Sequence, residues 1–192
     1  MTSPFTAQFG RIERQFRALE VARRELQAVS AEAQRASKQA IFALQRDDAA
    51  GADAKMADAA DALGSGWRLA SQESRLAAEG VWRAALEEFA EAAFVRELLG
   101  GEEVPEHPYL DDPAILIGGL SDAVGELVRY AVRCATFGRG GEVFGLAEVA
   151  EEAVAFLSSL DLTGPLRAKS DQARSHLRRL EDVRYDVAKR EP

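Results

Sequence analysis

The chain has 192 residues, of which 47% are hydrophobic and one, Cys134, is a cysteine. This length suits one all-helical domain over residues 1–192, or a subunit that completes its core in an oligomer, and a lone cysteine excludes an intrachain disulfide. No apolar run approaches the ~18 residues needed to cross a bilayer, and the N-terminus lacks the basic stretch and apolar core of a secretory signal, so we expect a cytoplasmic protein without membrane association.

Charge is distributed unevenly along the chain. The formal net charge is −8, yet residues 1–47 and residues 165–192 each carry 8 Lys and Arg against 5 Asp and Glu, while the segment between them carries 8 against 22. A net negative charge argues against a protein that binds nucleic acid simply by being basic. The acidic middle is either a solvated surface or a set of carboxylates with a specific task, and the charge pattern alone leaves both open.

Helix-forming residues dominate the sequence, and we predict an all-α fold of about six or seven helices. Ala, Leu, Glu and Arg are frequent, and no stretch shows the alternation of a β-strand. The first helix is predicted to be long, because Ser3 and Pro4 supply a cap and a first turn and apolar residues then follow at three- and four-residue spacing to about Arg46. Such a helix, about 60 Å long, must bury its apolar stripe against a partner in the bundle or in another subunit.

Glycines and prolines mark the predicted ends of the later helices. We predict a short helix over residues 55–63, a break at Gly64–Gly66, and a helical stretch over 67–99 with a candidate interruption at Gly80. A proline-rich loop follows from Gly100 to Pro113. Three more helices are predicted: one that is capped by Asp111 or Asp112 and runs to about Phe137, one from about Gly145 to Leu160, and a last one from about Pro165 to Lys189.

The stretch EEFAEAAF, residues 87–94, places carboxylates in an apolar segment. Glu88 and Glu91 are three residues apart and therefore project from one side of a helix, which also carries apolar residues. An unpaired buried carboxylate costs several kcal/mol, so such a group normally has a partner, a proton or a metal ion. A second acidic pair, Asp122 and Glu126, is four residues apart in GGLSDAVGELVRY, whose glycines indicate close helix approach or room for a ligand.

Close approach of these two helices would gather the four carboxylates. Oxygen ligands without histidine or cysteine suit Mg²⁺ or Mn²⁺ rather than zinc, and such an ion can orient a phosphodiester and activate water. The same spacing is common in acidic helical proteins, where the carboxylates are salt-bridged or solvated, so spacing alone leaves that alternative open. A ferritin-like di-iron site is excluded, because Val104 and Ala173, not glutamates, precede His107 and His176 by three residues.

Other side chains with chemical potential are expected to have structural roles. The glycines of GRGGEVFG lack the lysine and Ser/Thr of a phosphate-binding loop, so this stretch is interpreted as a helix connection. Cys134, Trp67 and Trp82 are expected to pack in the core, although the tryptophans could stack on bases. His107 is expected at the surface of its loop.

Four stretches of the chain resemble the translin family, and in particular its catalytic branch, translin-associated factor X. RRELQAVSAEAQRASKQAIFALQR is similar to the family's first helix, EEFAEAAFV to its Glu-x-x-Glu helix, GGLSDAVGELVRY to its Asp-x-x-x-Glu-Leu-x-Arg helix, and LEDVRYDVAKR to its C-terminal helix. The four stretches follow the family's order. Two features depart from it, because the loop after residue 100 is short where the family has an additional short helix, and the middle of the chain is more acidic than a nucleic-acid path.

The resemblance implies an all-helical subunit of a hollow oligomer, usually an octamer, that binds single-stranded RNA or DNA. The catalytic branch is a Mg²⁺-dependent endoribonuclease, and its acidic positions match Glu88, Glu91, Asp122 and Glu126. The non-catalytic translin branch lacks the glutamate pair, which this chain retains. Retention of that pair favours the nuclease.

Basic residues are the candidates for phosphate contact. Arg129 matches the family pattern and would either orient Glu126, which we prefer, or contact phosphate. Arg174, Arg178 and Arg179 of the last helix would contact the strand, with a solvated or salt-bridged helix face as the alternative.

We therefore expect a homo-octameric endoribonuclease that acts on single-stranded RNA inside its shell. The four carboxylates would hold one or two Mg²⁺ ions, or Mn²⁺ in their place, and the shell would admit only flexible strands. Two alternatives remain open: a translin-like protein that binds single-stranded RNA or DNA without catalysis, and a structural partner subunit of a catalytic, translin-like paralogue.

Overall fold

The computed structural model describes residues 5–101 and 103–190, which form seven α-helices, one short 3₁₀-helix and no strand. The elements are α1 (Thr6–Leu44), α2 (Ala49–Ala70), α3 (Ser74–Ala77), α4 (Gly80–Leu98), the 3₁₀-helix η1 (Pro108–Leu110), α5 (Pro113–Thr136), α6 (Gly140–Ser159) and α7 (Gly164–Ala188). The predicted all-α fold is confirmed. Ser3 and Pro4, the predicted start of the first helix, lie outside the described residues.

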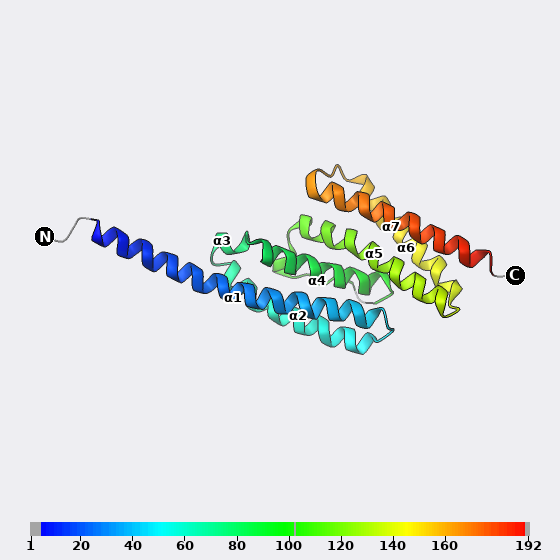
Figure 1. Ribbon diagram of the computed structural model, residues 1–192, viewed down its shortest axis with the longest axis horizontal. Helices are drawn as coiled ribbons and strands as arrows, with labels where there is room; N and C mark the ends of the chain where they lie inside the picture. The colour runs from blue at the N-terminus through cyan, green and yellow to red at the C-terminus, as the bar shows by residue number, and fades with distance from the viewer. Residues whose placement is uncertain (1–4, 102, 191–192) are drawn as a thin grey trace.

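The long helices pack in three layers (Figure 1). One outer layer holds α1 and α2, the other holds α6 and α7, and α4 and α5 lie side by side between them. One core cluster joins α1, α2 and α4 through residues such as Leu26, Leu63 and Phe89. A second joins α5, α6 and α7 through residues such as Leu127 and Leu180. Helix α4 therefore lies against the first core, and α5 lies against the second.

The first half of α1 extends beyond the body of the molecule (Figure 1). Phe9, Ile12 and Phe16 lie on this arm at three- and four-residue spacing, and each is about 60% exposed. From Leu26 onward, α1 is buried against α2 and α4. The expected partner for the apolar stripe is thus present within the chain for the second half of α1, whereas the arm exposes its stripe. None of the described helices is long and apolar enough to cross a bilayer.

Three predicted helix boundaries are wrong. The glycines of GSG do not interrupt α2, which continues to Ala70. Gly66 is buried, and an added Cβ at this position would collide with the Trp82 ring. The helix predicted over 55–63 begins earlier, at Ala49. The candidate interruption at Gly80 is confirmed, because the chain leaves α2 after Ala70, forms the short α3 and begins α4 at Gly80. The sixth helix begins at Gly140, five residues before the predicted Gly145. The conformational freedom of glycine predicts breaks at these positions, but Gly66 packs closely against Trp82 and Gly145 lies inside α6.

Two local features fix the connections around α5. Of the two predicted caps, Asp112 is the one that caps α5, because its carboxylate accepts the Ala114 N–H at 2.9 Å.

The turn between α1 and α2 contains Asp47 in the left-handed region, with φ 62°. The Tyr130 hydroxyl donates to the Asp47 carboxylate at 2.6 Å, and Arg133 pairs with it at 3.3 Å. This turn is therefore anchored to α5.

Two adjacent glycines let α5 approach α4. A Cβ built on Gly119 would lie 2.7 Å from the Ala90 Cβ and from the Glu91 backbone nitrogen, closer than real Cβ atoms come to other atoms. A Cβ on Gly118 would collide with the Glu87 carboxylate. Because the obstacle at Gly119 is backbone, it cannot move aside as a flexible side chain would. The predicted close helix approach is confirmed at these two positions.

Replacing Gly119 with alanine should therefore destabilise the protein. We expect Gly119→Ala to lower the free energy of unfolding by about 1–3 kcal/mol, as overpacking in a well-packed core does. Gly145→Ala is the matched control, because Gly145 is exposed inside α6 and its added Cβ would meet no atom within 4 Å; this variant should gain up to about 1 kcal/mol from helix propensity. Urea unfolding of both variants checks this, and equal stability would contradict the close approach.

Candidate functional site

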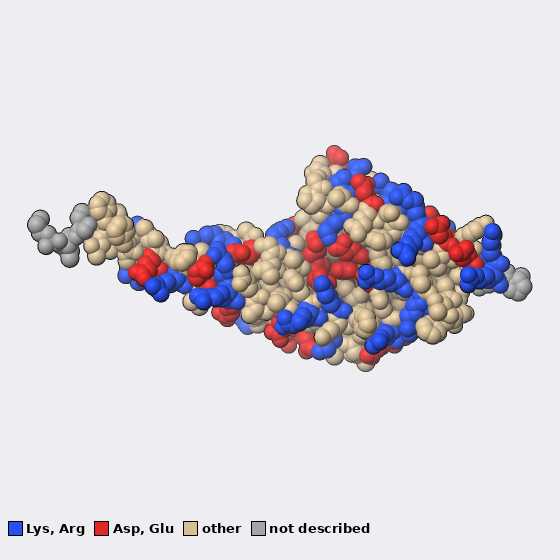
Figure 2. Space-filling view, in the orientation of Figure 1, with Lys and Arg blue, Asp and Glu red and all other residues tan. Residues whose placement is uncertain are grey.

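The pairing of α4 with α5 places the predicted carboxylates in one acidic cluster, which we define as Glu87, Glu88, Glu91, Asp122 and Glu126. Figure 2 shows an acidic patch in the middle of the face that carries α4 and α5, with basic side chains around it. The carboxylates interact electrostatically, because Glu88, Asp122 and Glu126 all raise the pKa of Glu91. The structure thus brings all four sequence-predicted acids together.

Glu91 is the least compensated member of the cluster. Its side chain is half-buried and forms no hydrogen bond or ion pair with the described residues. Burial, followed by the charges of Glu88, Asp122 and Glu126, raises its pKa to about 8, and Lys169 opposes this shift. A half-buried carboxyl with a strongly raised pKa among like charges is typical of functional sites.

Glu88 is also partly buried, and its side chain is 20% exposed. Burial raises its pKa, and Asp122 and Glu126 add to the shift. Lys38 of α1 opposes it from 3.5 Å away. Helix α1 therefore supplies a counter-charge to the acidic pair on α4.

Lys169 of α7 connects the two middle helices. Its ammonium nitrogen lies 2.9 Å from the Glu87 carboxylate on α4 and also donates a hydrogen bond to the Asp122 carboxylate on α5. Burial lowers the pKa of Lys169, but the two carboxylates outweigh burial and leave the pKa above its ordinary value. Lys169 is therefore a charged cross-link between α4, α5 and α7.

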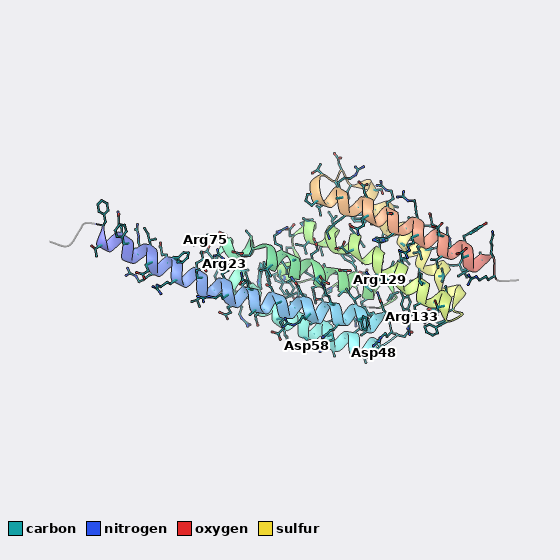
Figure 3. All side chains as sticks on the ribbon, in the orientation of Figure 1. Arg23, Asp48, Asp58, Arg75, Arg129 and Arg133 are labelled. Carbon is teal, nitrogen blue, oxygen red and sulfur yellow. The ribbon has the colours of Figure 1, made fainter. Side chains whose placement is uncertain are left out.

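Glu126 is almost fully buried and is held from two sides. The Arg129 guanidinium donates to one carboxylate oxygen at 2.6 Å, and the Gln45 amide at the end of α1 donates to the other. Arg129 lies along α5 near the C-terminal end of α1 (Figure 3). Of the two roles predicted for Arg129, the structure shows the orienting contact with Glu126; phosphate contact stays a prediction.

Sequence reasoning missed four residues of this site: Glu87, Lys169, Lys38 and Gln45. Glu87 was visible in the sequence, four residues before Glu91 and therefore on the same side of the helix. The other three come from α1 and α7, and only the packing of distant helices brings them to the cluster.

The donor set of the cluster fits a hard divalent cation, because carboxylate oxygens are the ligands that Mg²⁺ and Mn²⁺ prefer. Among the residues that the structure describes, no three such side chains are arranged around a single metal position. Asp122 and Glu126 instead point at Lys169, Arg129 and Gln45. The half-buried Glu91 carboxyl, which has no partner in the part of the chain that the structure describes, is the observation that supports a cation here, and the metal site stays a prediction.

The three predicted arginines of α7 lie on a helix rich in Lys and Arg (Figure 2). Arg174 pairs with Asp171 at 3.1 Å and donates to the Ser158 hydroxyl at 3.3 Å. Arg178 and Arg179 are exposed. Their predicted phosphate contacts are therefore sterically open, whereas Arg174 is already engaged within the chain.

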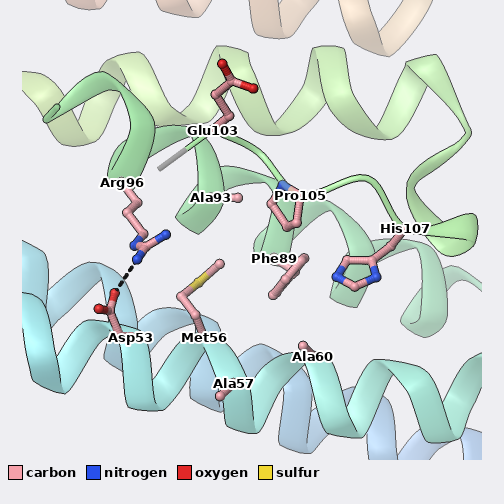
Figure 4. Close-up of a pocket in the computed structure, with 10 residues that line it drawn as sticks. All are labelled: Asp53, Met56, Ala57, Ala60, Phe89, Ala93, Arg96, Glu103, Pro105 and His107. Atoms are coloured by element: carbon pink, nitrogen blue, oxygen red, sulfur yellow. Dashed lines mark ion pairs between the residues drawn. The ribbon is translucent and has the colours of Figure 1, made fainter. Parts of the chain in front are cut away.

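A pocket of about 410 Å³ lies between α2, α4 and the loop before η1 (Figure 4). The Arg96–Asp53 ion pair, 2.7 Å long, closes one end, and His107 lies at the other end. His107, expected at the surface, is half-buried and stacks on Tyr109 with ring centroids 4.7 Å apart. None of the predicted site residues lines this pocket.

Cys134 and Trp82 are buried in the core, as predicted, and Trp67 is partly buried.

The raised pKa of Glu91 makes stability depend on pH. The unfolded chain loses this proton near pH 4.5 and the folded chain near pH 8, so unfolding releases a proton between these values and stability falls as pH rises. Glu91→Gln is neutral throughout and lacks this loss. In EDTA, its melting temperature should rise relative to the parent by a few degrees (roughly 2–4 °C per kcal/mol) between pH 5 and pH 8.

Glu148→Gln, which changes an exposed side chain of α6, gives the baseline for removing one surface carboxylate. Melting curves of the three proteins across this pH range check the expectation. A Glu91→Gln curve that runs parallel to that of the parent would show that Glu91 ionises normally.

Comparison with known proteins supports one family. A family model described as the translin family matches residues 115–191, which contain Asp122, Glu126 and Lys169 but not the acids of α4. No curated protein matches the chain. Three solved structures have the same fold. The first is apo-NeC3PO, with a TM-score of 0.85 and 17% identity over 97% of this chain and 99% of that chain. The second is a complex of AfC3PO with duplex RNA, with a TM-score of 0.83 and 23% identity over 96% of this chain and 98% of that chain. The third is AfC3PO, with a TM-score of 0.81, 24% identity and the same coverage as the second.

These structures share less than a quarter of their residues with the chain, so they establish the fold and leave the activity open. The assignment to the catalytic branch depends on Glu88 and Glu91, which lie outside the matched range, and stays a prediction. The family model confirms the resemblance to the translin family over residues 115–191, and the three solved structures share the fold over almost the whole chain.

Proposed function

We propose that the chain is a subunit of a homo-oligomeric, divalent-metal-dependent endoribonuclease that acts on single-stranded RNA. The observation that carries the proposal is the acidic cluster on α4 and α5, in which Glu91 is half-buried, has no hydrogen-bond or ion-pair partner among the described residues, and has its pKa raised by the charges of Glu88, Asp122 and Glu126. A surface that merely solubilises the protein would have its carboxylates exposed and would not raise their pKa through burial.

In this proposal Glu88, Glu91, Asp122 and Glu126 hold one or two Mg²⁺ ions, or Mn²⁺ in their place. When bound, such an ion polarises the phosphodiester and activates water for in-line attack. Arg129 and Gln45 fix the orientation of Glu126 by binding one oxygen each. The pKa of Glu91 is about 8, so in the metal-free protein at neutral pH this side chain keeps its carboxyl proton. A nearby cation favours the carboxylate form.

RNA binding is supported by the fold and by the charges of α7. AfC3PO, which shares the fold, has been solved in a complex with duplex RNA. On this chain the exposed Arg178 and Arg179 lie on α7, the helix that also sends Lys169 into the cluster. We propose that these two arginines contact phosphates of the strand and so offset the acidic surroundings of the site.

Self-association is supported by the exposed arm of α1. Phe9, Ile12 and Phe16 form an apolar stripe on a helix that projects from the body, and such stripes normally pack against another helix. We propose a closed, hollow homo-octamer in the cytoplasm, in which the acidic clusters face the interior and the shell admits flexible strands.

Two other functions are consistent with parts of the site. Lys169 and Arg129 already neutralise Asp122 and Glu126, which favours a protein that binds nucleic acid without cleaving it. A structural subunit that needs a catalytic paralogue would share the fold and the apolar arm. Neither alternative requires Glu91 to lie half-buried without a partner among the residues at 5–101 and 103–190.

One experiment separates the three functions. The purified chain alone is expected to have an octameric mass in solution and to cleave a labelled single-stranded RNA in Mg²⁺ but not in EDTA, with a matching duplex cleaved more slowly. Glu91→Gln should slow cleavage at least about 100-fold, because it removes an oxygen ligand of the ion. Glu148→Gln should cleave like the parent, because its side chain is exposed on α6 outside the cluster.

Each alternative gives a different pattern. Strand binding without cleavage in Mg²⁺ or Mn²⁺ indicates the non-catalytic binder. Cleavage that appears only after a paralogue is added indicates the structural subunit. Cleavage by Glu91→Gln at the parent's rate would remove the site assignment.

A further inference from the structure

We propose that Lys169 is a tethered cation of the acidic cluster, which occupies the place of a divalent ion in the metal-free protein and leaves Asp122 when such an ion binds. This inference rests on the proposed metal site and adds a competitor to it. It assigns a specific role to α7, which supplies none of the carboxylates.

The position of Lys169 is that of a bridging ion. Its ammonium contacts Glu87 on α4 and Asp122 on α5, so it links the two helices that carry the acids. Side chains of Glu87, Asp122 and Lys169 are 29%, 31% and 26% exposed, so the contacts are partly shielded from water. Partly shielded ion pairs are screened less by salt than pairs on the open surface.

Gly118 leaves room for this arrangement. An added Cβ at Gly118 would collide with the Glu87 carboxylate, so that carboxylate lies directly over the α5 backbone. The absence of a side chain at this position allows Glu87 and Asp122 to meet the same ammonium. Gly118 therefore has a role at the site besides helix packing.

Lys169 is the best-shielded counter-charge in the cluster. Five carboxylates face three basic side chains, which leaves two negative charges when all are ionised. The other two bases, Lys38 and Arg129, are 65% and 71% exposed, so water and salt screen their charges more strongly. A divalent ion that binds Asp122 must therefore displace the Lys169 ammonium or accept its repulsion at close range.

The alternative role for Lys169 is direct contact with a phosphate of the strand. Its ammonium is already engaged by two carboxylates, whereas Arg178 and Arg179 on the same helix are exposed. Guanidinium groups also bind phosphate with better geometry than ammonium groups do. Competition with a divalent ion is therefore the role that the geometry favours.

Manganese binding tests the proposal without any measurement of cleavage. Titration of the metal-free, full-length protein with Mn²⁺, followed by the electron paramagnetic resonance signal of the free ion, gives the affinity directly. Lys169→Met should bind Mn²⁺ at least about tenfold more tightly than the parent, because a positive charge next to the ion is removed. Lys169→Arg, which keeps the charge, should bind like the parent.

Lys55→Met is the matched control. It removes one lysine charge from α2, where Lys55 pairs with Asp58, and should leave Mn²⁺ affinity unchanged. Melting curves provide a second readout that a purely structural role would not reproduce. In EDTA, Lys169→Met should melt a few degrees below the parent (roughly 2–4 °C per kcal/mol), and saturating Mn²⁺ should restore its melting temperature to that of the parent or above.

Two failures can be told apart. If the parent binds Mn²⁺, Glu91→Gln abolishes the binding and Lys169→Met binds no more tightly than the parent, the tethered-cation role is wrong and the metal site stands. If neither the parent nor Lys169→Met binds Mn²⁺, or if Glu91→Gln leaves the binding unchanged, both the metal site and the competition at it are wrong.

Discussion

The close approach of α4 and α5 at Gly118 and Gly119 is the constraint on which the site depends. Without Cβ atoms at these positions, α5 can lie against the backbone of α4 beside Glu91. Acids that are more than thirty residues apart in sequence then share one electrostatic environment, which raises the pKa of Glu91. The same two helices separate the two hydrophobic cores, so the helices that carry the acids are also held from both sides by the rest of the fold.

Gathering carboxylates on packed helices opposes folding unless their charge is compensated. The outer layers provide this compensation: Lys38 and Gln45 reach the cluster from α1, and Lys169 reaches it from α7. Each layer of the bundle therefore contributes to the site, although only the middle layer carries its acids. Compensation is incomplete at Glu91, where a proton is retained near neutral pH. An incompletely neutralised, oxygen-rich cluster is an environment in which a divalent cation is stabilised.

The helical fold and the four acidic positions could be predicted from the sequence, because helix periodicity and three- or four-residue spacing are local properties. The structural role of these glycines could not be predicted from the local sequence. Gly64 and Gly66 indicate a break but lie inside α2, whereas Gly118 and Gly119 lie inside α5 and allow close packing. The Trp82 ring, which comes from α4, leaves no room for a side chain at Gly66, and this contact is not visible in the local sequence. Lys169 had no local signal at all, because its two partners are on other helices. The cap of α5 could be predicted in part. The sequence limits it to Asp111 or Asp112, and the hydrogen bond from the Ala114 N–H identifies Asp112 as the cap.

The central claim is that α4 and α5 together present a binding site for a hard divalent cation. The most direct measurement is a crystal of the protein soaked in Mn²⁺, with anomalous diffraction data collected at the manganese edge. Our account predicts an anomalous peak between Glu91 and the acids of α5, within roughly 2.0–2.3 Å of carboxylate oxygens, with the Lys169 ammonium moved away from Asp122. Peaks confined to other surfaces, or an undisturbed Lys169–Asp122 pair at saturating Mn²⁺, would contradict it.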